Sequence, residues 1–350
     1  LAKNLINKKI NVHIYYKKIV TKFSSNRTIG ISKDNLEFFE KNIIKLPKKN
    51  KWEINKIEIY SKKLKNNKIL NFKNNNKGLF YMLKNDELYR LLNDKLTKSK
   101  FFKKKVINLF FSYNELLKKN KYDLIINCDQ NNPISKKYFI KKIEKDYKNF
   151  AYTTILVHEK LRNNSAIQVF TKLGPVAFLP ISKTKTSVVC SVDTSHKTYN
   201  DNEILELIKK HNPQFKIKKN SKFISFPLKS SILRKYYHKN ILAFGELLHK
   251  IHPLAGQGFN MTIRDIKDLS EIIQNRINIG LQLDTLILEE FERKTKNRNF
   301  IFSSGIDFIY EFFNFDKKRG TNLNKILKYF GSNKTFMSSV IKLADKGINI

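Results

Sequence analysis

The segment from Ile241 to Asn260 limits the possible fold more than any other part of the sequence. An apolar run, Ile241 to Phe244, is typical of a buried strand, and Gly245 and Glu246 follow it directly. A glycine-rich turn from Leu254 to Asn260 then leads into a helical pattern. A strand, a glycine-rich turn and a helix in this order predict an α/β fold that binds a ligand at the carboxyl end of the strand.

The turn suits an anion or an electron-rich ring as its ligand. Gly256 and Gly258 allow the backbone to approach a ligand closely, because neither residue carries a side chain. Free N–H groups at the start of the next helix carry a partial positive charge. The alternative interpretation is a glycine-rich connection between strand and helix with a purely structural role.

The basic character of the chain has a plain explanation. The 350 residues, enough for one large or two medium domains, include 69 Lys and Arg against 30 Asp and Glu, for a formal net charge of +39. Such a charge can indicate a polyanion partner. Here the basic residues are spread along the chain, and they are abundant together with Asn, Ile and Phe, as A/T-rich codon usage would produce. We therefore expect no nucleic-acid partner.

Other simple features bear on the compartment and the extent of the protein. Cys128 and Cys190 lie in apolar runs without metal-binding spacing, which predicts two buried free thiols in a reducing cytoplasm. Neither a membrane-spanning run nor a signal pattern appears. The chain opens without Met on a helical pattern, Leu1 to Asn7, followed by a strand-like run, Ile10 to Tyr16. We expect a strand, a loop and part of a helix to precede it in the natural protein.

Helical and strand-like patterns indicate two interleaved domains. Helical spacing covers Lys33 to Leu46 and Leu88 to Leu96, and beyond Phe259 the pattern is helical almost to the end. Strand patterns dominate from Phe150 to Pro227. The other expected strands are a hairpin of Ile54 to Tyr60 with Ile69 to Phe72, a run from Val106 to Tyr113, and a buried parallel strand within Tyr122 to Asp129.

Several motifs together give a specific resemblance. Gly245 and Glu246, with His252 to Asn260 and Asp265, resemble the second flavin motif of the aromatic-ring hydroxylases, flavoprotein monooxygenases similar to para-hydroxybenzoate hydroxylase. Gly174 to Pro180 is a second specific match, and within the family the chain is most similar to the ubiquinone-biosynthesis hydroxylases. Supporting matches extend the resemblance over nearly the whole chain: Arg27 to Ser32, Tyr81 to Leu92, Asp123 to Asp129, Tyr147 to Glu159, Phe226 to Leu228 and Phe291 to Lys294.

The resemblance implies a particular division of the chain. An FAD/NAD(P)-binding, Rossmann-like domain of an α/β fold would be interleaved with a β-sheet substrate domain and followed by a helical C-terminus. The FAD-binding domain would comprise residues 1–50, 81–145 and 231–275, without its first strand and GxGxxG loop. The β-rich substrate domain would comprise 51–80 and 146–230, and the C-terminal helical region 276–350.

The resemblance also implies an activity. A non-covalent FAD, reduced by NAD(P)H, would react with O2 to a flavin hydroperoxide that hydroxylates an aromatic ring of a polyprenylated phenol in ubiquinone biosynthesis. Arg27 would approach the pyrophosphate, Glu246 the ribityl chain and Pro253 the reactive edge of the flavin, and Gly256 to Asn260 would surround its pyrimidine end. The implied cofactor-binding residues are Arg27, Asp129, Gly245, Glu246, Pro253, Gly256, Gln257, Gly258, Phe259 and Asn260. Only Pro253 is assigned to the reaction centre, and no acid or base is assigned.

Three positions depart from the pattern of the family. Tyr16 stands where an acid would bind the adenosine ribose, Gln130 replaces a glycine after Asp129, and Glu246 replaces an aspartate. They motivate an alternative hypothesis, a catalytically degenerate homologue that serves as a structural subunit of a quinone-biosynthesis assembly. We expect no metal site at His249 and His252, because no third ligand has suitable spacing.

An aromatic stretch near the C-terminus allows two interpretations. Its members are Phe300, Phe302, Ile306, Phe308, Ile309, Phe312, Phe313 and Phe315, followed by Lys317, Lys318 and Arg319. They can pack in the core, or they can form an amphipathic face that touches a membrane or a partner protein. Because a polyprenylated substrate resides in the membrane, a peripheral position at its inner face fits the second interpretation.

Overall fold

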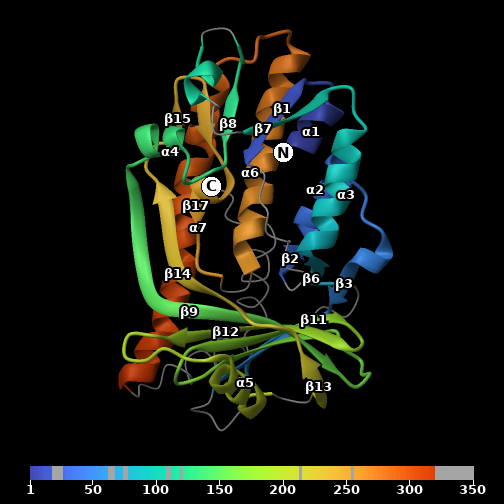
Figure 1. Cartoon of the computed structure of the whole chain (residues 1–350), viewed down its shortest axis with the longest axis vertical. Coiled ribbons are helices and arrows are strands. Elements are labelled where there is room, and N and C mark those ends of the chain that lie inside the picture. Colours follow the sequence, from blue (N-terminus) through green and yellow to red (C-terminus); the bar gives the residue numbers. More distant parts are fainter. Residues whose placement is uncertain are drawn as a thin grey trace.

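The computed structural model describes residues 1–17, 27–61, 68–73, 78–107, 112–118, 121–212, 215–253 and 256–319. A large sheet crosses the lower part of the molecule in Figure 1, and most of the helices lie above it. No helix in these ranges is long and apolar enough to cross a membrane. Of the aromatic stretch, the side chains of Phe312, Phe313 and Phe315 and of the three basic residues lie outside the described part.

Parallel strand pairs form the upper part of the molecule. Strand β1 (Val12–Lys17) pairs with β7 (Phe102–Ile107), and β8 (Ile125–Asn127) pairs with β16 (Ile241–Ala243). Strand β15 (Tyr237–His238) joins β16 in antiparallel orientation. All three residues of β16 are buried, as is typical of a parallel strand covered on both faces. The predicted parallel strand within Tyr122 to Asp129 is thereby confirmed.

Helices enclose these strands. They are α1 (Ala2–Asn7), α2 (Lys33–Asn42), α3 (Asn85–Thr97), α4 (Pro133–Tyr138), α6 (Gln257–Asn278) and α7 (Leu286–Arg319), with 3-10 turns at Lys48–Asn50, Tyr113–Leu116 and Gly245–Leu247. The main hydrophobic cluster joins apolar residues of α2, β16, α6 and α7, among them Phe39, Leu242, Leu269 and Phe291. These helices therefore bury their apolar faces against the parallel strands and against one another.

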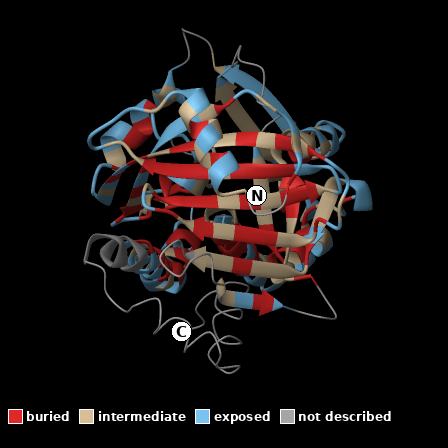
Figure 2. Ribbon diagram, turned by 90° about the horizontal axis from the view of Figure 1, so that it is seen from below, coloured by how far each residue is buried: buried red, intermediate tan, exposed pale blue. Residues whose placement is uncertain are grey.

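The large sheet has nine strands in the order β17-β14-β9-β12-β11-β10-β4-β5, with β13 also paired to β9. Its strands are β4 (Lys56–Ser61), β5 (Lys68–Lys73), β9 (Lys142–His158), β10 (Ser165–Phe170), β11 (Pro175–Ser182), β12 (Lys185–Asp193), β13 (Ile217–Asn220), β14 (Ile224–Leu233) and β17 (His249–Lys250). Helix α5 (Asp201–Lys210) covers the lower face, and the central strands seen behind it in Figure 2 are mostly buried.

A small sheet links the two parts. Strand β6 (Phe80–Lys84) lies between β2 (Thr28–Ser32) and β3 (Lys51–Ile54). Ile54 and Met82 of this sheet pack against Ala166 and Ile181 of the large sheet. Thr28 Oγ1 also donates a hydrogen bond of 2.8 Å to Ser187 Oγ of β12. The small sheet therefore fixes β2, and the helix start that lies against it, relative to the large sheet.

The predicted hairpin of β4 and β5, the strands of the β-rich block and the helical pattern from Phe259 to Arg319 are confirmed, while 320–350 lie outside the described residues. Two other predictions were wrong in detail. The helix expected to reach Leu46 ends at Asn42. The strand expected from Val106 to Tyr113 begins earlier, at Phe102, and Tyr113 lies in a 3-10 turn, with 108–111 outside the described residues. Helix α5 was missed, although the pattern Asn200-x-x-Glu203 is a capping box and Ile204 and Ile208 have helical spacing.

The prediction of two buried thiols was wrong for one cysteine. Cys190 is buried within β12, but Cys128 is exposed. Cys128 directly follows β8, at the carboxyl edge of the parallel strands. The apolar run before it predicted burial and contained no signal of where the strand stops.

Candidate functional site

The parallel pairing of β8 and β16 brings distant parts of the sequence to one edge. Ala243 lies opposite Asn127, so that the residues following each strand emerge together. Gln130 Nε2 donates a hydrogen bond of 2.6 Å to the backbone oxygen of Glu246. Ligands of open α/β sheets bind at this carboxyl edge. The structure therefore brings together Asp129, Gln130, Gly245 and Glu246, as their assignment to one site requires.

Arg27 reaches the same edge from the segment before β2. Its Nη2 atom lies 3.6 Å from Glu246 Oε1, and the two side chains are 69% and 67% exposed. An ion pair this exposed contributes little stability, about 0 to 1 kcal/mol. Either partner is therefore available to a ligand that offers better hydrogen bonds.

The amino end of α6 is open. Gly256 stands at the N-cap in the left-handed conformation, with a φ of 64°, and has no side chain to cap the helix. Within the described ranges no side chain accepts from the N–H groups of the first turn, and they are a ready site for an anion or a carbonyl oxygen. A Cβ atom at Gly256 would lie 3.9 Å from the Gly30 nitrogen, so the turn lies against β2. Pro253 is exposed, and Leu254 and Ala255 lie outside the described residues.

Asn260 joins α6 to β2 and α2. Its Oδ1 accepts hydrogen bonds from the Ser32 backbone N–H (2.8 Å) and from Asn35 Nδ2 (3.0 Å). Its Nδ2 donates to the backbone oxygens of Gly30 (3.0 Å) and Gly256 (3.2 Å). Groups of the protein itself therefore satisfy the hydrogen bonds of this buried side-chain amide. Its side chain therefore holds the open helix end in place, and the contact assigned to Asn260 remains a prediction for its backbone N–H.

The other residues of the turn differ in environment. Phe259 packs against the main hydrophobic cluster, and a Cβ atom at Gly258 would make ordinary contact with Ile251. Gln257 Oε1 is buried without a hydrogen-bond partner among the described residues. A buried acceptor without a donor is costly, so an unpaired oxygen at the first residue of α6 is consistent with a ligand that supplies one.

A buried polar cluster secures the next turns of α6. Asp265 Oδ2 accepts a hydrogen bond from His249 Nε2, and Asp265 Oδ1 accepts one of 3.0 Å from Asn299 Nδ2 of α7. Arg298 Nη2 lies 3.6 Å from Asp265 Oδ1 and 2.6 Å from Asp268 Oδ2. Sequence reasoning noted Asp265 only as part of a motif. The structure shows that it joins β17, α6 and α7.

The two histidines have separate environments. His249 bonds to Asp265, whereas the ring of His252 lies 4.7 Å from that of Tyr147 and 4.4 Å from that of Tyr310. Burial, and secondarily the charge of Lys145, lowers the pKa of His252 to about 4. The described residues contain no group of three His, Cys, Asp or Glu side chains that could hold a metal ion.

The carboxyl end of β1 carries an unusual pair. Tyr16 is the second-last residue of β1, and Lys104 Nζ of β7 is 4.5 Å from the centre of its ring. Such a distance allows a cation–π interaction. A tyrosine with a lysine above it differs in charge from the acid that the resemblance leads one to expect there.

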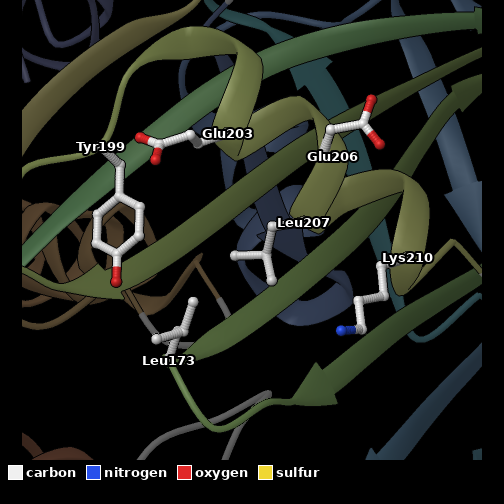
Figure 3. Close-up of a pocket in the computed structure, with 6 residues that line it drawn as sticks. All are labelled: Leu173, Tyr199, Glu203, Glu206, Leu207 and Lys210. Atoms are coloured by element: carbon white, nitrogen blue, oxygen red, sulfur yellow. The ribbon is translucent and has the colours of Figure 1, made fainter.

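A pocket of about 350 Å³ lies elsewhere, between α5 and the large sheet. In Figure 3 it is lined by Leu173, Tyr199, Glu203, Glu206, Leu207 and Lys210. Glu203 is already used, because it closes the capping box of α5 and pairs with Lys197. Helix α5, which supplies most of the lining, lies on the other side of the large sheet from α6 (Figure 1), and the pocket brings together none of the predicted site residues.

Comparison with solved structures defines the class of the fold. The p-nitrophenol 4-monooxygenase PnpA of Pseudomonas putida DLL-E4 superposes with a TM-score of 0.75 at 11% identity, over 100% of this chain and 95% of its own. PqsL of Pseudomonas aeruginosa, a probable FAD-dependent monooxygenase, gives 0.65 at 13% identity, over 97% and 95%. The fold is that of the flavin-dependent monooxygenases, as the resemblance predicted.

Sequence comparison narrows the resemblance. The chain is 27% identical over 183 residues to a mitochondrial ubiquinone biosynthesis monooxygenase of Dictyostelium discoideum, covering 42% of this chain and 37% of that protein. It is 28% identical over 175 residues to the 3-demethoxyubiquinol 3-hydroxylase of Escherichia coli K12, covering 46% and 44%. The predicted similarity to ubiquinone-biosynthesis hydroxylases is confirmed. The matches span less than half the length of these relatives, and no family model matches the chain.

Proposed function

We propose that the chain is an FAD-dependent monooxygenase of ubiquinone biosynthesis that hydroxylates an aromatic ring of a polyprenylated phenol, with NAD(P)H as reductant. One observation carries the proposal. Arg27 and Glu246 are far apart in the sequence but meet at the carboxyl edge of the parallel strands, and the start of α6 lies against β2, the strand that directly follows Arg27. The names of the similar hydroxylases support the substrate class.

The residues present fit a flavin. The uncapped N–H groups of α6 and the unpaired Gln257 Oε1 offer both donors and an acceptor to a polar ring edge. Arg27 would hold the pyrophosphate, since a guanidinium suits phosphate geometry. Asp129, Gly245 and Glu246 would line the part of FAD that links its ring system to its adenosine half. Pro253 would lie at the reactive edge of the flavin ring. When bound, the flavin would supply the transfer of an oxygen atom from O2 to the ring, and the protein would orient the reactants and exclude water.

The test is flavin binding by the full protein. We expect a yellow preparation that retains FAD and oxidises NAD(P)H when the phenol is present. Gly256→Val should weaken FAD binding at least tenfold, because a branched side chain conflicts with the left-handed backbone and turns toward β2. Gly280→Val is a matched control, because Gly280 has a φ of 72° and nothing lies within 4 Å of its Cβ position. It should lose similar stability but keep FAD.

The same measurements judge the second candidate, a structural subunit without turnover. Tyr16 beneath Lys104 favours it, because this pair cannot accept two ribose hydroxyl hydrogen bonds as a carboxylate does. A preparation that stays colourless with added FAD, yet co-purifies with other enzymes of quinone synthesis, would replace the first proposal by the second.

We further propose a peripheral position at the cytoplasmic face of the membrane. The aromatic stretch is divided in the structure: Phe302 and Ile306 are buried, but Phe300, Ile301, Phe308 and Ile309 are exposed, Phe308 by 68%. Apolar side chains on the outside of a basic protein suit an anionic lipid surface. The protein should sediment with vesicles containing phosphatidylglycerol, and a Phe300→Ser, Phe308→Ser variant should do so several-fold less. Equal sedimentation of both would rule this face out.

The division into an FAD-binding domain (1–50, 81–145, 231–275), a substrate domain (51–80, 146–230) and a helical region (276–350) remains part of this proposal. The small sheet bears on its boundaries, because β3 pairs with β6 while the following β4 and β5 belong to the large sheet. Residues 51–54 therefore pair within the sheet that also contains β2, although the division assigns them to the substrate domain.

A further inference from the structure

Three aromatic rings from distant parts of the chain meet next to the candidate site. Tyr147 belongs to β9, Tyr310 to α7, and His252 directly precedes Pro253. The ring of Tyr147 lies 4.7 Å from that of His252 and 4.9 Å from that of Tyr310. All three residues are buried. His252, directly before the exposed Pro253, is therefore enclosed by side chains of β9 and α7.

A hydrogen bond joins the two outer elements of this cluster. The Tyr147 hydroxyl donates to Asp307 Oδ1, one turn before Tyr310 on α7. Desolvation, and secondarily this bond to Asp307, raises the pKa of Tyr147, so that its hydroxyl keeps its proton throughout the physiological range. Lys145 Nζ and Glu311 Oε1, 2.9 Å apart, add an ion pair between the same two elements. The contact between β9 and α7 is therefore specific in geometry.

The apolar neighbour of His252 is held by the same helix. Ile251 packs in a cluster with Met261 of α6 and with Phe302 and Ile306 of α7. Phe302, Ile306 and Tyr310 are spaced four residues apart, so that they form one stripe along α7. This stripe contacts the start of α6 on one side and the residues before the turn on the other. Pro253 itself is exposed, so the contacts of this segment with α7 are made by Ile251 and His252.

We infer that Tyr147, Asp307 and Tyr310 form a positioning device that fixes His252 and, together with the contacts of α7 with Ile251 and Met261, the open end of α6 that receives the flavin. The inference rests on the proposed flavin site. None of the three residues is placed in contact with the flavin. They act by fixing His252, and a small displacement of positioning groups is enough to weaken a preorganised site.

Tyr147→Phe and Asp307→Ala test the device, with Tyr152→Phe as matched control. Tyr152 lies on the same strand, and its hydroxyl also donates a hydrogen bond, of 3.0 Å, to the backbone oxygen of Tyr199. Hydrogen exchange of the amides of residues 256–261 is measured in flavin-free protein and compared with amides of β12. We expect about tenfold faster exchange at 256–261 in the two variants, with β12 unchanged, and no such local change in Tyr152→Phe.

FAD affinity gives the second readout. The dissociation constant for FAD should rise about tenfold in Tyr147→Phe and in Asp307→Ala. In the double variant it should rise no further than in either single variant, because both changes remove the same hydrogen bond. In Asp307→Asn it should rise less, because asparagine keeps an acceptor oxygen. Equal exchange at 256–261 in wild type and variants would overturn the inference, and so would an equal effect of Tyr152→Phe. If the wild type binds no FAD, the proposed function fails. The exchange measurement would still decide whether the device positions the start of α6.

Discussion

Replacing Asp265 with alanine should lower the free energy of unfolding by about 3 to 5 kcal/mol, the range found when one partner of a buried ion pair is removed. The carboxylate is fully buried and accepts hydrogen bonds from His249 and Asn299. Its loss leaves these two donors without an acceptor, and Arg298 keeps only Asp268. Because the three donors come from β17 and α7, the variant should loosen α7 from α6. Urea unfolding followed by tryptophan fluorescence and circular dichroism measures the change.

Two further variants make the result specific. Asp265→Asn keeps the size and one acceptor oxygen, so it should lose clearly less than the alanine variant. Glu206→Ala removes an exposed carboxylate that pairs with Lys209 one turn along α5. It should cost less than about 1 kcal/mol, as surface ion pairs do. If Asp265→Ala and Glu206→Ala differed by less than 1 kcal/mol, the buried cluster would not stabilise the contact of α6 with α7.

Replacing Asn260 with leucine should cost about 3 kcal/mol and abolish retention of FAD. Leucine has the same branching of its side-chain heavy atoms and is larger, so the loss comes from polar groups and crowding and not from a cavity. The Ser32 N–H, Asn35 Nδ2 and the Gly30 oxygen would each lose a buried partner, and unsatisfied buried groups cost about 1 to 3 kcal/mol apiece before relaxation. The start of α6 would no longer be tied to β2. Unfolding free energy and bound FAD per protein are the quantities to measure.

Asn164→Leu is the control for this change. Asn164 donates one hydrogen bond, 2.9 Å to the Glu53 backbone oxygen, in an exposed position. Water can replace that donor, so the variant should stay within about 1 kcal/mol of the wild type and keep its flavin. Should Asn260→Leu retain FAD as the wild type does, the link between β2 and α6 would not be needed for the site.

The sequence predictions were most accurate where a feature depends on residues that are close together in the sequence. The strand Ile241–Ala243, the helix from Gln257 and the hairpin of β4 and β5 depend on residues close in sequence, and each was predicted near its observed place. Helix ends and strand ends were less accurate, as the early end of α2 at Asn42 illustrates. Local sequence patterns indicate that a helix or strand exists, whereas the residue at which it ends depends on its tertiary contacts.

The candidate site divides in the same manner. The residues from Gly245 to Asn260 were found because glycines and an acid stand together in the sequence. The internal bonds of Asn260 and the role of Asp265 were not found, because their partners lie on β2, β17 and α7. A side chain assigned to a ligand and one used by the protein itself look alike in a sequence.

The sequence by itself therefore determined the class of fold, the resemblance to flavin-dependent hydroxylases and the segment proposed as the site, because periodicity and glycine positions act through local backbone preferences. Only the tertiary structure decided which polar groups are free for a ligand and which hold α6, α7 and β9 together. Those contacts join residues far apart in the sequence: Tyr147 and Asp307 are 160 positions apart, and Ser32 and Asn260 are 228 positions apart. Their hydrogen bonds are strengthened by the low dielectric that burial creates, which no local pattern in the sequence specifies.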